Sequence, residues 1–420
     1  MPAPRDVTGL VPAGVLGKPR TVEEELSRGA DLSIISVVNA LVERAGALGA
    51  SDIHVDPGTD AVRVRMRVDG VLQEACSYPK DIHNEVVSRV KVLAGLRTDE
   101  HQATQDGRFR FLPDEGKPVD MRVSIAPTYH GENIVLRLLS DNAEQFSLEM
   151  LGFSEGDRKK ILDAIKKPHG MILSTGPTGS GKTTTLYTLI KMLNSPEVSI
   201  VTIEDPIEYS VADIEQIQVN ARVGLTFANG LRSVLRQDPD IIMVGEIRDA
   251  ETAGIAVNTA LTGHLLLSTL HTNDAATTLP RLLDMGIDAY LVSTTINIAI
   301  GQRLVRRICS ACKVSRPMTK AEVDALSGVK LARPMEEEET IYKGKGCDAC
   351  NGSGYKGRIS VNEVLVADAE VREAILRKAS AGELRSIAVK NGMTTMLEDG
   401  FAKVRAGETT IEEVLRVIHD

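Results

Sequence analysis

The stretch GPTGSGKTTTLY, Gly176 to Tyr187, decides the fold of the larger part of this 420-residue chain. It follows the apolar run MILST and leads into TTTLYTLIKML, so it joins an expected buried strand to an expected helix. Its glycines let successive backbone N–H groups turn inward onto phosphate oxygens, and the helix N-terminus adds partial positive charge. A chance glycine-rich turn is the alternative, but the flanking elements favour a site for a nucleoside triphosphate.

Each position of this loop has an expected task. Lys182 is expected to reach the β and γ phosphates, and the hydroxyl of Thr183 to bind Mg²⁺. The predicted nucleotide contacts in the loop are Gly176, Pro177, Thr178, Gly179, Ser180, Gly181, Lys182, Thr183 and Thr184. The sequence therefore predicts ATP and Mg²⁺ as cofactors.

Two acid-bearing segments follow apolar runs that are typical of buried strands. TIEDPIEY carries Glu204 and Glu208, and IIMVGE ends on Glu246. Acid-rich turns are common on protein surfaces. Here, however, ligands collect at the carboxyl ends of parallel strands, where a carboxylate can orient or deprotonate an attacking water. We therefore predict Lys182, Glu204, Glu208 and Glu246 as catalytic residues.

TGHLLLSTLHT places His264 and His271 on either side of another apolar run. A lone histidine is usually an ordinary polar side chain. A pair that flanks a buried strand can sense the γ-phosphate, but only by the logic of the fold. The spacing leaves both interpretations open.

Hydrophobic periodicity divides the chain into two main parts and indicates an α/β fold. Alternating apolar and polar runs, with two helical patterns, predict a small α+β domain with a half-buried antiparallel sheet. Continuous apolar runs between helices then predict a parallel sheet covered on both faces. The expected boundaries are a flexible leader at 1–31, the α+β domain at 32–140, a linker at 141–150, a P-loop core at 151–304, a cysteine element at 305–355 and a helical C-terminal part at 356–420.

Four of the five cysteines form two CxxC pairs, Cys309 with Cys312 and Cys347 with Cys350. Two such turns can close a tetrahedron of thiolates around Zn²⁺. The pairs lie far apart in sequence, but the cost of closing a loop grows only with the logarithm of its length. Redox pairs or unrelated buried thiols are the alternatives, and we predict a structural zinc site.

Composition argues against some classes of function. The net charge of −9 and the 3% of aromatic residues do not favour nucleic-acid binding by charge or by stacking. No run reaches the roughly 18 apolar residues of a membrane helix. We expect a cytoplasmic protein whose contact with a membrane would have to go through a partner.

Four boxes stand in order and resemble those of the ATPases of type II secretion and type IV pilus systems. GPTGSGKT, TIEDPIEY, LRQDPDIIMVGEIRD and TGHLLLSTLHT are similar to the Walker A, Asp, Walker B and His boxes of that family. SDIHVDP, RMRVDGVL, QDGRFR, DMRVS and GENIVLRLL resemble the PAS-like domain that precedes its RecA-like motor domain. The resemblance implies that Glu208 is the catalytic base and Glu246 the Walker B acid. It also implies that Arg108, Arg122 and Arg137 reach the nucleotide, although such arginines otherwise indicate a solvated sheet face.

The resemblance also implies a function. Members of this family are hexameric ring motors that use ATP hydrolysis to move an inner-membrane platform protein, so that pilin-like subunits join a filament. The tetracysteine element resembles that of assembly-type members, and His264 and His271 resemble the His-box pair. Family members often carry a docking domain where this chain has about thirty residues before its first expected helix, so binding to a docking protein is a weaker expectation.

Three alternatives stay open from the sequence. One is a DNA-uptake (competence) pilus motor, and another is a scaffold that binds nucleotide without turning it over. The third is a nucleic-acid translocase. Its basic footprint would be Arg303, Arg306, Arg307 and Lys313.

Overall fold

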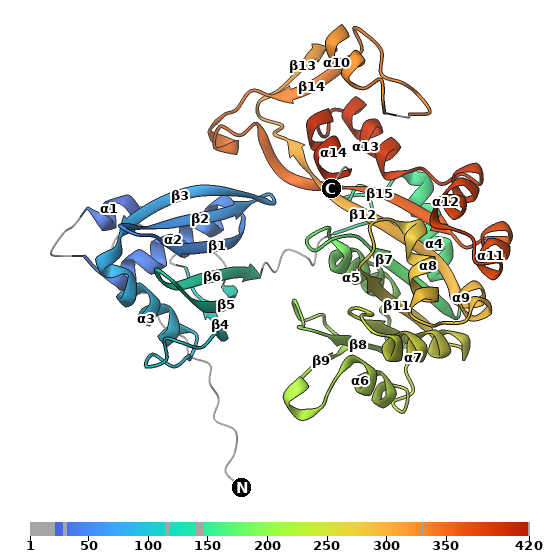
Figure 1. Cartoon of the computed structure of the whole chain (residues 1–420), viewed down its shortest axis with the longest axis horizontal. Helices are drawn as coiled ribbons and strands as arrows, with labels where there is room; N and C mark the ends of the chain where they lie inside the picture. The colour runs from blue at the N-terminus through green and yellow to red at the C-terminus, as the bar shows by residue number, and fades with distance from the viewer. Residues whose placement is uncertain (1–21, 28–31, 114–117, 140–145, 330, 419–420) are drawn as a thin grey trace. The chain divides into compact units, whose positions relative to one another are not determined.

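The computed structural model describes residues 22–27, 32–113, 118–139, 146–329 and 331–418. The chain divides into two compact units, Met1–Glu144 and Gln145–Asp420, and each unit has its own main sheet (Figure 1). The expected leader at 1–31 lies outside the described residues, apart from α1 (Val22–Leu26) and Ser27.

The first unit is built on a six-stranded antiparallel sheet in the order β3-β2-β1-β6-β5-β4. Its strands are β1 (Ala50–Pro57), β2 (Ala61–Val68), β3 (Val71–Pro79), β4 (Gln105–Phe111), β5 (Val119–Thr128) and β6 (Gly131–Leu139). Asp69 and Gly70 turn β2 into β3 with φ angles of 49° and 85°, as a tight hairpin requires.

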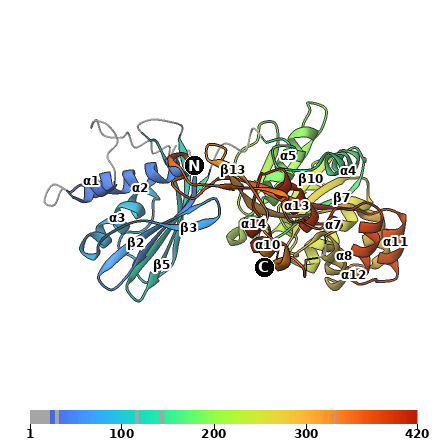
Figure 2. The same ribbon diagram turned by 90° about the horizontal axis from the view of Figure 1, so that it is seen from above.

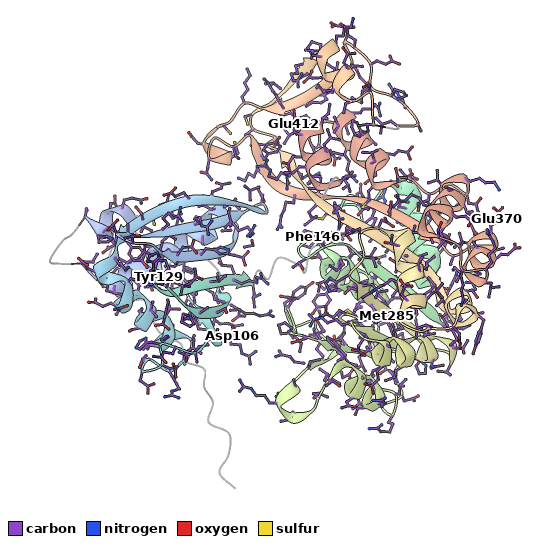
Figure 3. The ribbon with its side chains drawn as sticks, viewed as in Figure 1. Asp106, Tyr129, Phe146, Met285, Glu370 and Glu412 are labelled. Atoms are coloured by element: carbon purple, nitrogen blue, oxygen red, sulfur yellow. The ribbon has the colours of Figure 1, made fainter. Side chains whose placement is uncertain are left out.

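Two helices cover one face of this sheet, α2 (Ile34–Leu48) and α3 (His83–Leu93), and the short η2 (Lys80–Ile82) leads into α3 (Figure 2). Ser33 caps α2 by accepting the N–H of Ser36, and Gly49 ends it in the left-handed region. Apolar side chains of the strands and of both helices form a single core. The opposite face is polar, and Asp106 and Arg108 lie exposed on it along β4 (Figure 3).

The second unit is built on a seven-stranded sheet in the order β15-β12-β7-β11-β10-β8-β9. Its strands are β7 (Gly170–Thr175), β8 (Ile200–Glu204), β9 (Glu215–Gln218), β10 (Ile241–Val244), β11 (Leu265–Leu270), β12 (Ile296–Ile308) and β15 (Tyr355–Val366). All neighbours pair in parallel except β15, which runs antiparallel to β12.

Helices cover both faces of the second sheet, because its strands are apolar on both sides. Met171 and Leu173 of β7 enter one core and Ile172 enters the other. The helices of this unit are α4 (Glu155–Ile165), α5 (Lys182–Leu193), η4 (Ala221–Val223), α6 (Phe227–Val234), α7 (Ala250–Leu261), α8 (Ala275–Asp284), α9 (Ala289–Thr295), α10 (Lys320–Ala325), η5 (Asp348–Cys350), α11 (Ala369–Leu376), α12 (Ala381–Lys390), α13 (Met396–Arg405) and α14 (Ile411–Ile418).

The chain after Gly352 differs from the sequence-based expectation of a purely helical part. It first forms β15, whose residues from Ile359 to Leu365 are buried on β12, and only then the helices α11 to α14. At the start of α14, the hydroxyl of Thr410 accepts the N–H of Glu413 at 3.4 Å, which is half of a capping box. The carboxylate of Glu413 instead binds Arg306 and Arg416, each at 2.7 Å.

Within the part of the chain that the structure describes, no helix combines the length and the apolar character that crossing a bilayer requires.

A buried ion pair ties α3 to β6 in the first unit. Lys91 is fully buried, and its Nζ lies 2.7 Å from Oε1 of Glu132. The other oxygen of Glu132 lies 2.7 Å from Nδ1 of His101. Burial alone would raise the pKa of Glu132, but hydrogen bonds from His101 and Lys91 hold that pKa below its usual range. The pair therefore stabilises the unit above the unfolded-state pKa, and this contribution is lost as the pH falls through the folded-state pKa.

We expect Glu132→Gln to destabilise the first unit by about 3 kcal/mol at pH 7, since Lys91 is left buried without its anion. Hydrogen exchange of the amides of α3 and β6 measures this change. Acidification from pH 7 to about pH 3 should weaken the wild-type unit more than the variant, because only the wild type loses this carboxylate. Asp99→Asn, in an exposed pair with Arg97, is the control and should change little. Equal protection in wild type and Glu132→Gln at pH 7 would contradict the assignment.

Candidate functional site

Parallel pairing brings four chain segments to one edge of the seven-stranded sheet. Thr175 at the end of β7 is in register with Leu270 at the end of β11. Val244 at the end of β10 is in register with Ile203 of β8. The segments that leave this edge are the loop Gly176–Gly181, the acidic segment 204–208, the turn with Glu246 and the turn with His271.

The loop Gly176–Gly181 has the conformation that a phosphate cradle requires. Gly181 has a φ of 90° and precedes α5, and a Cβ there would lie 2.8 Å from Nε2 of Gln302. Pro177, Thr178 and Gly179 are exposed at the crown of the loop. Ser180 is buried, and its Oγ has no hydrogen-bond partner among the described residues. The loop thus fits an anion that approaches its backbone N–H groups.

Lys182 starts α5 and turns back onto the loop. Its Nζ donates to the carbonyl oxygens of Gly176 and Pro177, both at 2.9 Å. Burial lowers the pKa of this ammonium, the charge of Glu246 opposes that change, and Arg303 adds to it. Thr183 and Thr184 follow on the first turn of α5 and are half-buried. A cation held in a buried site beside backbone N–H groups suits a polyphosphate.

Glu246 lies between a histidine and an arginine. Its Oε2 is 2.8 Å from Nε2 of His271, and its Oε1 is 2.6 Å from Nη2 of Arg248. The hydroxyl of Thr269 donates to the carbonyl oxygen of Gly245 at 2.8 Å and fixes the main chain before the acid. The carboxylate is therefore oriented at the strand edge from which the P-loop departs.

The structure does not bring His264 to this edge. His264 precedes β11 and His271 follows it, so about 20 Å of strand separates them. The carbonyl oxygen of His264 accepts the N–H of Gly170 at the start of β7, and its Nδ1 lies 3.2 Å from the carbonyl oxygen of Thr259. Within one chain, only His271 of the pair lies beside the P-loop edge.

Glu204 is enclosed by polar side chains beneath the acidic segment. Its oxygens accept hydrogen bonds from Tyr187, from Thr202 at 2.7 Å and from Gln216 at 3.1 Å. Burial raises the pKa of this carboxyl group, while the three donors oppose that rise. Glu208, four residues on, is only half-buried. Of the two acids, Glu208 is the one whose side chain has access to water.

Gln216 on β9 fastens the segment that carries Glu208. Its Nε2 donates to the carbonyl oxygen of Tyr209 at 3.1 Å, and its Oε1 accepts the N–H of Val211 at 2.8 Å. The same amide binds Glu204, which Tyr187 links to the P-loop helix α5. The acidic segment and the P-loop helix are therefore held by one polar cluster.

Two further contacts join the P-loop to its neighbours. The hydroxyl of Thr175 donates to the carbonyl oxygen of Thr272 at 2.8 Å, next to His271. Gln302 of β12, also buried, accepts a hydrogen bond from Thr185 of α5 at 2.9 Å. No local motif marks Gln216 or Gln302, because strand pairing brings them to this edge from distant parts of the sequence. Tyr187 lies on α5 itself, but its partner Glu204 comes from β8.

The first unit carries its candidate arginines in one row. Arg108, Arg122 and Arg137 are register partners on β4, β5 and β6. Arg137 binds Asp52 at 2.9 Å, and Arg67 lies 3.6 Å from the same carboxylate. Guanidinium groups can bind the oxygens of a phosphate group through paired hydrogen bonds.

The four paired cysteines meet at one point. Sγ atoms lie 3.9 Å apart in Cys309–Cys347 and in Cys312–Cys350, and 3.7 Å apart in Cys347–Cys350. A tetrahedral metal ion with bonds of about 2.3 Å requires sulfur atoms about 3.8 Å apart. The thiol set therefore fits a metal ion.

Strand pairing explains how two distant pairs close this site. Ile308 at the end of β12 is in register with Tyr355 at the start of β15, which brings the two CxxC turns together. The chain between them leaves and returns as the antiparallel pair β13 (Lys313–Pro317) and β14 (Thr340–Gly344), with α10 between them (Figure 1).

Comparisons with known proteins agree with this arrangement. The family described as Type II/IV secretion system protein matches residues 28–416. The chain is 48% identical over 387 residues to type II secretion system protein E of Xanthomonas campestris pv. campestris, covering 92% of this chain and 68% of that protein. It is 46% identical over 379 residues to the type IV pilus assembly ATPase PilB of Thermus thermophilus, covering 90% of this chain and 42% of that protein.

A solved structure shares the fold. The ATPase DotB of Legionella pneumophila matches with a TM-score of 0.65 and 25% identity, covering 91% of this chain and 95% of that one. The predicted family and the α/β, RecA-like fold class are therefore confirmed.

We expect Gln216→Leu to lower the turnover of ATP about 10- to 100-fold, because the segment with Glu208 loses its fastening and a small displacement of a reacting group is costly. The affinity for ATP should stay within about 2-fold, since the loop Gly176–Gly181 is untouched. Phosphate release and titration with a fluorescent ATP analogue measure the two quantities. Gln218→Leu, at an exposed position of the same strand, is the matched control. An unchanged turnover in Gln216→Leu would show that this fastening is dispensable.

Proposed function

The chain belongs to the type II/IV secretion system protein family, and we propose that it is an ATP-hydrolysing motor that powers the assembly of a pilus or of a secretion pseudopilus. The observation that carries this proposal is the meeting of Lys182, Glu246 and His271 at the strand edge from which the P-loop departs. A phosphate cradle with an oriented acid beside it can turn nucleotide over rather than only hold it.

The backbone of Gly176–Gly181 would hold the phosphates, and Lys182 would leave its two loop carbonyls to bind the β and γ oxygens. Mg²⁺, when bound with ATP, supplies charge neutralisation at these oxygens. Thr183 and Glu246 are the residues that would hold it. His271, bonded to Glu246, would keep that carboxylate oriented. ATP and Mg²⁺ are thus the cofactors of the proposed reaction.

Glu208 would orient and deprotonate the attacking water. Its half-exposed position and its place on the segment that Gln216 fastens support this role. Glu204 was also predicted to be catalytic. Because its oxygens already bind Tyr187, Thr202 and Gln216, we assign it a positioning role beneath Glu208.

The row of Arg108, Arg122 and Arg137 would contribute positive charge to a bound nucleotide. A guanidinium fork matches phosphate oxygens, and it stabilises the developing charge of phosphoryl transfer. Arg137 would have to share its bond with Asp52. Arg108 and Arg137 are exposed and Arg122 is half-buried. Because Arg137 already binds Asp52, Arg108 is the first candidate.

The partners of the proposed motor follow from the family. Further copies of this chain would form a homohexameric ring, and an inner-membrane platform protein would receive the motion. The relatives named for type II secretion and for pilus assembly support a place at such a machine. A cytoplasmic docking protein is a further candidate partner.

The tetracysteine cluster would hold zinc in a structural role, because four thiolates fill a tetrahedral zinc ion. Backbone N–H groups of Cys347 and Gly354 point at Sγ of Cys350, both at 3.2 Å, and favour its thiolate form.

We expect close to one zinc ion per chain in the purified protein, measured by atomic emission. Cys347→Ser should release most of it, whereas Cys76→Ser should not, since Cys76 lies alone in the first unit. Zinc retained at full occupancy in Cys347→Ser would contradict the site.

We expect Glu208→Gln to lower ATP turnover by about 100-fold or more, since a general base contributes that much to proton transfer. Affinity for ATP should persist, because the cradle is intact. Phosphate release under saturating Mg²⁺–ATP and binding of a fluorescent analogue test both. Glu215→Gln, an exposed acid on β9, is the matched control. If Glu208→Gln hydrolysed ATP at the wild-type rate, Glu208 would not be the catalytic base. If the wild-type chain hydrolysed no ATP, the proposed motor function would be refuted.

A further inference from the structure

Glu363 of β15 is a buried carboxylate that joins the starts of two helices. It is 2% exposed, and Oε1 accepts the N–H of Ala275 at 2.8 Å while Oε2 accepts the N–H of Met396 at 3.4 Å. These are the first residues of α8 and of α13. The N–H groups of a first helical turn have no partner within the helix, and they carry partial positive charge. One buried carboxyl group therefore meets both helix starts.

Gly301 makes room for this carboxylate. It is the register partner of Glu363 on β12. A Cβ at position 301 would lie 2.8 Å from Cγ and 2.9 Å from Oε1 of Glu363, and 3.0 Å from the backbone N of Ala275 that this oxygen binds. The backbone of Gly301 is outside the left-handed region, so glycine is needed here for space and not for conformation. The side chain of Glu363 lies beside the Cα of Gly301, where any other residue would have its Cβ, and reaches Ala275 of α8.

Hydrogen bonds join the first turn of α8 to the turn 271–274 that precedes it. Asp274 caps the helix by accepting the N–H of Thr277 at 2.8 Å, and Thr272 bonds to Thr278 at 2.9 Å. Arg385 of α12 holds Asp274 from outside in a further ion pair. A shift of the first turn of α8 must therefore shift the turn 271–274.

The turn 271–274 contacts the proposed site at two points. Nε2 of His271 lies 2.8 Å from Oε2 of Glu246. The carbonyl oxygen of Thr272 accepts a hydrogen bond at 2.8 Å from the hydroxyl of Thr175, the residue that precedes the P-loop. Neither contact involves Glu363 itself. The hydrogen bonds of the carboxylate go to the starts of α8 and α13 and not to the P-loop, so its hydrogen-bonded route to the turn 271–274 runs through α8.

We propose that Glu363 is a positioning residue of the ATPase site, which holds the start of α8 so that His271 and Thr272 stay aligned with Glu246 and the P-loop. This inference rests on the proposed function. It assigns a task to a strand of the C-terminal part that no motif of the sequence marks.

Two variants test the inference from opposite sides. Glu363→Gln replaces one of the two acceptor oxygens by an NH₂ donor, and Gly301→Ala displaces an intact carboxyl group. Each should lower kcat about 10- to 100-fold and leave the dissociation constant for ATP within about 2-fold, because only alignment is lost. The double variant should lose no more than the worse single variant, since both act on one contact. Hydrogen exchange of the amides of 271–278 should rise in each variant.

Glu413→Gln is the matched control, since Glu413 is also a buried carboxylate of the C-terminal part but binds Arg306 and Arg416. It should lower the melting temperature without lowering kcat at 25 °C. The inference is overturned if Glu363→Gln and Gly301→Ala are folded and turn over ATP at the wild-type rate, or if their losses are additive. If a variant does not fold, unchanged exchange at 271–278 in the other overturns it. A wild-type chain that hydrolyses no ATP would instead refute the proposed function, and the inference with it.

Discussion

The register between β7 and β11 is the constraint on which the site depends. With Thr175 level with Leu270, the P-loop and the turn of His271 leave the sheet at the same height, and the hydroxyl of Thr175 can bind the main chain of Thr272. A slip of one residue would turn every buried side chain of β7 to the other core and separate these groups. The apolar strands on both faces oppose such a slip, so the hydrophobic packing of the sheet also aligns the P-loop with the turn of His271.

A second layer of buried or half-buried polar residues holds the edge in place. Glu204, Gln216, Gln302 and Glu363 each bind groups from elements other than their own strand, and most of their hydrogen bonds link the core to loops at the edge. Burying such groups is costly unless they are hydrogen-bonded, so each one specifies a single arrangement of its loop. The loops can then carry half-exposed residues such as Glu208 without losing their geometry.

Sequence patterns predicted the parts of this molecule whose signal is local. The P-loop, the acidic turns, the CxxC pairs and the alternating strands of the first unit each show their role within a few residues. Partners that meet only through strand pairing show no such signal, and for this reason Gln216, Gln302 and Glu363 were missed. The two histidines illustrate the same limit, because a strand of six residues places His264 at the edge away from His271. The strand β15 was missed because its run also suits a helix, and only β12 beside it decides between them.

The most direct test of the account is a structure of the chain with Mg²⁺ and a non-hydrolysable ATP analogue. We expect the triphosphate against the backbone of Gly176–Gly181, with Nζ of Lys182 moved from the carbonyl oxygens of Gly176 and Pro177 onto the phosphates and with Glu246 and Glu208 facing the γ-phosphate. A nucleotide bound elsewhere, with Lys182 still on its loop carbonyls and both acids turned away, would contradict the account.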